Sequence, residues 1–129
     1  MAKGRDKHDA HQAALAALGR DLSRRARSAC ELCEDRTSLK VVEVAGGPSD
    51  PEVDWALMLC ERCILAVEDN RRAPSANELR FVEGTAWSEI RPVQITAVRL
   101  ARRLAADDVG WARDLLDGLY LDEAVEALL

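Results

Sequence analysis

Two short stretches of this sequence decide its fold: CELC at residues 30–33 and CERC at residues 60–63. Each has two residues between its cysteines, a spacing at which a tight turn presents both sulfur atoms to one ion. The two pairs are separated by 26 residues, and the chain has 4 cysteines in all. The pattern predicts one zinc ion held by four thiolates, those of Cys30, Cys33, Cys60 and Cys63.

Three other uses of paired cysteines compete with a zinc site. Disulfides are disfavoured in a cytoplasmic protein, because thiols are kept reduced there. A thioredoxin-like redox site has one CxxC within a βαβ unit, whereas this chain has two that flank a predicted hairpin. An iron–sulfur cluster also takes four thiolates, so the cysteine count leaves it open. Zinc held by four thiolates has no open position for water or substrate, and we therefore expect a structural site.

The residues between the two pairs predict an antiparallel β-hairpin. LKVVEV at residues 39–44 and WALML at residues 55–59 have the apolar and β-branched residues of strands, and the turn-rich AGGPSDPEV lies between them. Together with the cysteine pairs, the hairpin makes a small zinc ribbon. A short helix is expected directly after Cys63.

Apolar spacing predicts helices on both sides of this ribbon. Leucines recur at helical spacing within residues 9–28. Pro92 suits the first turn of a helix ending near Asp107, which is followed by a second helix and by a short one that starts at Asp122 and runs to Leu129. The predicted fold class is α+β, in a single domain 1–129 with an N-terminal helix in 1–29, the ribbon in 30–70, a linker in 71–84 and a helical part in 85–129.

Composition and charge limit the class of protein. The chain has 129 residues, of which 48% are hydrophobic, enough for one core. No stretch reaches the roughly 18 apolar residues of a membrane helix, and the polar start lacks the apolar run of a signal peptide, so we expect a cytoplasmic protein. The net charge is −5, yet residues 1–29 are basic and residues 107–129 strongly acidic. The basic helix either lies on the acidic end or the two form separate solvated faces.

Large aromatic side chains are scarce, with 3 tryptophans beside one phenylalanine and one tyrosine. Such side chains bury much apolar area and supply a large part of a small core. We therefore expect Trp55, Trp87 and Trp111 to join the ribbon to the helices.

Several segments carry a specific combination of motifs: CELC before a VVEV strand, LMLCERC, AWSEIRPVQITAVRLARRL and DLLDGLYLDE. Over roughly residues 28–124 this combination resembles the PhnA family, bacterial zinc-ribbon proteins named after their association with alkylphosphonate-utilisation genes. The resemblance places the family's ribbon cysteines on the two CxxC pairs and its WSE segment on residues 87–89. It brings no catalytic residue, and the HWRCLN usual before that segment is replaced by ELRFV at residues 78–82.

The sequence favours a non-enzymatic binding or interaction module with a protein partner over two alternatives. A nucleic-acid-binding ribbon is suggested by two groups of arginines at helical spacing. An acidic chain repels phosphates unless its basic residues are segregated, and arginines so spaced are often merely solvated. The two groups are Arg20, Arg24 and Arg27 in the first helix, and Arg99, Arg102 and Arg103 in the last third.

A phosphonate or phosphoester hydrolase is the enzymatic alternative, and the family name suggests it. The polar residues to inspect would be Ser88 and Glu89, beside Trp87. The sequence has no glycine-rich phosphate loop and no obvious pairing of nucleophile and base. The simpler interpretation is that Ser88 and Glu89 stabilise the start of a helix.

Overall fold

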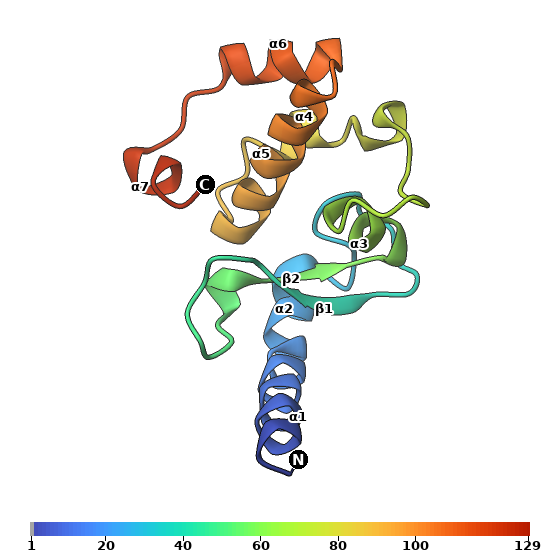
Figure 1. Ribbon diagram of the computed structural model, residues 1–129. Helices are drawn as coiled ribbons and strands as arrows, with labels where there is room; N and C mark the ends of the chain where they lie inside the picture. Colours follow the sequence, from blue (N-terminus) through green and yellow to red (C-terminus); the bar gives the residue numbers. More distant parts are fainter. Residues whose placement is uncertain (1) are drawn as a thin grey trace.

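A two-stranded antiparallel sheet lies at the centre of the fold (Figure 1). The computed structural model describes residues 2–129, with side chains from Gly4 onward. Strand β1 (Lys40–Glu43) pairs with β2 (Ala56–Leu59) in the register Lys40 to Leu59 and Glu43 to Ala56. The long connection between them includes the short 3-10 helix η1 (Val53–Trp55). The predicted hairpin and the α+β class are confirmed.

Strand β2 is buried along its whole length because helices cover both faces of the sheet. Leu57 and Leu59 belong to the main core, which they share with helix α5 (Arg91–Ala106). Ala56 and Met58 point to the other face and pack with Leu22 of helix α2 (Gly19–Ala26). Side chains alternate between the two faces of a strand. Because both faces of β2 are covered, apolar residues occupy every position, whereas a strand with one exposed face alternates apolar and polar residues.

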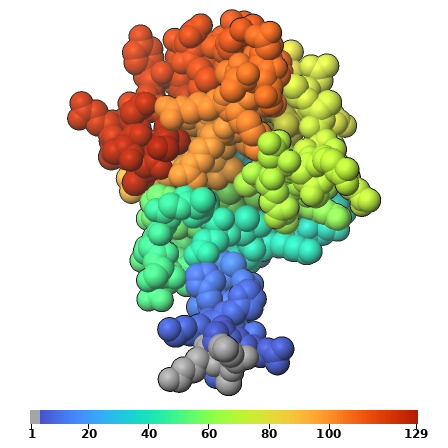
Figure 2. Space-filling model, in the orientation of Figure 1, coloured from blue at the N-terminus to red at the C-terminus, as the bar shows by residue number. Residues whose placement is uncertain are grey.

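The N-terminal segment forms two helices where the sequence predicts one. Helix α1 (Ala2–Ala17) is followed after Leu18 by α2, which buries Leu22 completely under the sheet. Helix α1 contacts the sheet through Leu15 and through a 2.9 Å contact between His11 and Glu43. Figures 1 and 2 show α1 projecting from the body, away from α5 and from the acidic C-terminal end. The basic helix therefore does not lie on the acidic end, and the alternative of two separate faces holds.

The C-terminal half is helical, as predicted, but its elements differ in length. Residues 71–84, predicted to be a linker, contain two short helices and bury Leu79 and Val82 completely in the core. The final helix ends at Glu126 rather than Leu129. None of the described helices is long and apolar enough to cross a membrane. The remaining elements are α3 (Glu61–Val67), η2 (Ala76–Leu79), α4 (Val82–Thr85), α6 (Gly110–Gly118) and α7 (Glu123–Glu126).

The prediction that all three tryptophans anchor the core is wrong for Trp87. Its side chain is 51% exposed, whereas Trp55 and Trp111 pack against the main core. Trp87 lies in the turn between α4 and α5, where the neighbouring Ala86 takes the inward position and is fully buried. In this turn one residue points into the core and the next points outward. Composition alone does not reveal which of the two neighbours is buried.

Gly47 allows the loop before η1 to lie directly on Trp55. A Cβ atom at Gly47 would stand 2.8 Å from Cγ and Cδ2 of the Trp55 ring, inside contact distance. We expect Gly47→Ala to move the rigid ring and destabilise the protein by roughly 1–3 kcal/mol, the usual cost of overpacking. Gly110→Ala is the matched control, because nothing lies within 4 Å there. Urea unfolding measures both variants, and equal midpoints would contradict this packing.

Candidate metal centre

The four predicted ligands come together at one end of the hairpin. The sulfur atoms of Cys30, Cys33, Cys60 and Cys63 all lie within 4.8 Å of one another, and those of Cys33 and Cys60 are 3.5 Å apart. Tetrahedral bonds of about 2.3 Å to zinc would place sulfurs about 3.8 Å apart. All four cysteines are free and too far apart for a disulfide bond of about 2.05 Å. They are positioned to bind one metal ion.

The first pair sits in a tight turn that follows directly on α2. Arg27 and Ser28 both have a φ of 56°, which ends the helix and reverses the chain. The Cys30 N–H then donates to the Asp35 carbonyl (2.7 Å), and the Glu34 N–H donates to the Cys30 carbonyl (2.9 Å). A hydrogen bond with Cys63 lowers the pKa of Cys30 most, and backbone N–H groups of this turn, at Leu32 and Cys33, lower it further.

The second pair opens helix α3 at the end of β2. Cys60 is the residue before the helix and Cys63 lies in its first turn, where the Ile64 N–H donates to the Cys60 carbonyl (3.0 Å). The first N–H groups of a helix have no partner within it and carry partial positive charge. Thiolates are favoured in that position.

The pKa values of Cys30, Cys60 and Cys63 are shifted in different directions. The hydrogen bond from Cys63 lowers the pKa of Cys30 to about 4, whereas burial raises the pKa of Cys60 to about 11. Hydrogen bonding to Cys30 also raises the pKa of Cys63. Crowded sulfurs cannot all be anions unless a cation neutralises them, and a metal ion that binds here must displace the remaining protons. Interaction with Cys33 raises the pKa of Arg62, an exposed cation beside the cluster.

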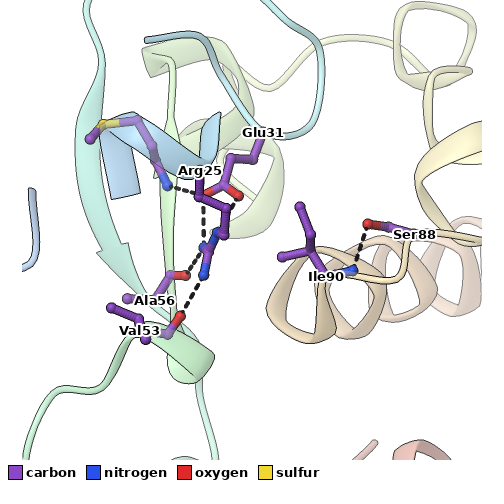
Figure 3. Close-up of polar contacts among 7 residues, drawn as sticks. Arg25, Glu31, Val53, Ala56, Ser88 and Ile90 are labelled. Carbon is purple, nitrogen blue, oxygen red and sulfur yellow. Dashed lines mark hydrogen bonds and ion pairs between the residues drawn. The ribbon is translucent and has the colours of Figure 1, made fainter. Parts of the chain in front are cut away.

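A buried ion pair fixes the first pair of cysteines to the sheet (Figure 3). Arg25 binds Glu31 through two hydrogen bonds of 2.8 Å, and also donates to the carbonyls of Val53 and Ala56. Glu31 in turn accepts from the Met58 N–H (3.0 Å), and its side chain is only 2% exposed. Sequence reasoning missed this pair, because Glu31 stands as a spacer inside CELC and its partners lie on α2 and β2.

A cleft of about 880 Å³ opens beside the first pair. Its lining includes Cys30 and Cys33. The Arg25–Glu31 pair lies opposite Ser88 and Ile90, which directly precede α5 (Figure 3). Ser88 Oγ accepts a hydrogen bond from the Ile90 N–H (3.1 Å). The other two residues of its motif, Trp87 and Glu89, are exposed and do not line the cleft.

The two arginine groups predicted from the sequence have different environments. Arg99 donates to the carbonyls of Ala45 (2.8 Å) and Leu128 (3.1 Å). Arg103 donates to the Ala66 and Val67 carbonyls at the end of α3, and Arg102 pairs with Glu126 at 3.0 Å. This group therefore holds the chain together. The other group, Arg20, Arg24 and Arg27, is exposed and lines one shallow hollow.

No protein-family model matches the chain, and neither does a curated protein or a solved structure. These comparisons give the chain no family. The PhnA resemblance stays a prediction carried by its motifs, while the four-cysteine cluster rests on the geometry above.

Replacing Glu31 should destabilise the fold more than replacing an exposed carboxylate. Glu31→Ala leaves the Arg25 charge and the Met58 N–H without their partner in a buried place, a loss of roughly 3–5 kcal/mol. Glu83→Ala is the control, because its pair with Arg80 is exposed and should contribute little. Both variants are unfolded in urea with zinc present. An equal, small effect in the two would show that the buried pair does not hold the turn.

Proposed function

We propose that the chain is a non-enzymatic binding module, in which a structural zinc ion fixes one wall of the cleft. The observation that supports this most directly is the convergence of four cysteine sulfurs within 4.8 Å. Four thiolates fill the tetrahedral coordination of zinc, so no position is left for a water or a substrate. The ion would neutralise the thiolates and join the turn after α2 to the start of α3.

The geometry favours a single ion over an iron–sulfur cluster. In a cluster the cysteines bind different iron atoms, which separates their sulfurs. Here the Cys33 and Cys60 sulfurs, from opposite pairs, lie only 3.5 Å apart. Soft thiolates in a tetrahedral set suit zinc, and the PhnA resemblance of the surrounding motifs supports the same ion.

The hydrolase alternative has less support. Ser88 would have to be activated by a neighbouring base, yet its hydroxyl accepts a hydrogen bond from the Ile90 N–H. This is the contact expected of a residue that stabilises a helix start. The exposed Glu89 is separate from the cleft lining. We therefore propose no catalytic residue.

A protein partner is the first class that the sequence favours, and exposed Trp87 and Tyr120 could contribute to such a contact. A second class, nucleic acid, is favoured by one specific observation. Arg20, Arg24 and Arg27 are exposed, whereas Arg99, Arg102 and Arg103 are engaged within the chain. A binding experiment on the surface formed by Arg20, Arg24 and Arg27 distinguishes these two classes of partner.

Metal content and hydrolysis together test the proposed function. The purified chain should contain one zinc ion, whose binding supplies roughly 10–16 kcal/mol in structural sites, as much as the stability of a whole domain. Chelation, or Cys33→Ser, should remove the ion and the near-ultraviolet dichroism of Trp55. Hydrolysis of p-nitrophenyl phosphate or of a phosphonate monoester should not exceed that of buffer. A turnover lost on chelation or in Ser88→Ala would overturn the proposal.

A further inference from the structure

The basic face of α2 adjoins the cleft at the first cysteine pair. Arg20 and Arg24 lie at i and i+4 on one side of α2, and Arg27 is the residue that ends the helix, with a φ of 56°. They line a shallow hollow together with Ser23 and Ser28. Arg27 also lines the cleft, in which Arg36 is a further cation. The two hollows therefore share Arg27 as a lining residue.

These arginines have no carboxylate partner within residues 4–129. Seven arginines in that range bind carboxylates or carbonyl oxygens, namely Arg25, Arg36, Arg80, Arg99, Arg102, Arg103 and Arg113. Other exposed arginines, such as Arg71 and Arg72, also bind neither, but they do not line this hollow. Positive charge near the C-terminus of α2 also complements the helix dipole. That effect accounts for cations in the last turn, but it does not require Arg20, Arg24 and Arg27 to share one hollow.

The cleft itself is suited to an uncharged, flat group. Phe81 and Ile90 supply apolar surface, while Thr85 and Ser88 supply hydroxyl groups. A metal held by four thiolates keeps a net negative charge, and Glu34 lies on the same lining. Glu31 is neutralised by Arg25. A phosphate is therefore favoured at the outer arginines and disfavoured deep in the cleft, where a neutral base can enter.

We propose that this surface binds single-stranded nucleic acid. Phosphates lie along Arg20, Arg24 and Arg27, and one unpaired base enters the cleft beside Phe81. A single strand is required because bases in a duplex are paired and cannot turn into a cleft, whereas unstacked bases bind aromatic side chains. The acidic α7 end lies away from α2 (Figure 1), so its repulsion of phosphate is distant. The inference rests on the proposed function, since the metal holds one wall of the cleft.

Binding of the zinc-loaded chain to fluorescent 12-nucleotide single strands of DNA and RNA tests this at several salt concentrations. Each phosphate contact on a single strand contributes about −0.7 to the slope of log K against log salt. Replacing Arg20, Arg24 and Arg27 with Ala should make that slope shallower by about 2. The control replaces Arg71, Arg72 and Arg91, which are also exposed and line neither hollow, and changes the net charge equally. This control variant should keep most of the affinity for the strand and most of the dependence of log K on log salt.

A second variant tests the cleft without touching the core. Gly84 lines the cleft, and nothing lies within 4 Å of a Cβ built there. Gly84→Gln should fill the space for the base and weaken binding about tenfold, the effect of one lost stacking contact. Gly110→Gln is the control, because Gly110 is equally open and lies outside the cleft. Near-ultraviolet dichroism and zinc content accompany every variant.

Four outcomes would overturn the inference. They are no binding of either single strand at 20 mM salt, equal losses in the two arginine variants, equal affinities of Gly84→Gln and Gly110→Gln, and tighter binding of a duplex or of polyglutamate. A difference in affinity between the DNA strand and the RNA strand shows which sugar the surface prefers. If the chain is folded and holds one zinc ion but binds no strand, this inference is wrong and the proposed function stands. Zinc-dependent hydrolysis instead removes the proposed function.

Discussion

The mutual repulsion of four crowded thiolates is the constraint on which the rest of the structure depends. The two cysteine pairs come from the end of α2 and the start of α3, yet their sulfurs lie within 4.8 Å of one another. Buried anions so close are tolerated only when protons or a cation neutralise them. The four cysteines are positioned to bind one metal ion. Such an ion would replace the protons and tie both ends of the hairpin together, and folding and metal binding would then be one event.

The Arg25–Glu31 pair extends this constraint to the helices. It joins α2, the first cysteine turn and β2 through hydrogen bonds that bury Glu31 almost completely. The position of α2 under the sheet, and of the arginines on its outer face, is thus coupled to the metal centre. A change in the cysteine turn would be transmitted to the cleft wall, because Arg25, Glu31 and Cys30 all line it.

The sequence predicted the hairpin, the cysteine cluster and α5, because each follows from local spacing: paired cysteines, β-branched strands and a helical stripe of apolar residues. It could not predict that Trp87 is exposed, since the direction of one residue in a turn depends on the neighbouring helices. Nor could it distinguish the arginines. Arg99 and Arg20 have similar local patterns, and only the fold brings the Ala45 and Leu128 carbonyls to Arg99.

The most direct test of this account is X-ray absorption at the zinc edge of the protein as purified. The account predicts a single shell of four sulfur atoms at about 2.3 Å from the ion. A first shell that contains nitrogen or oxygen, or an iron signal with iron neighbours, would contradict it, because the site would then be open or would hold a cluster.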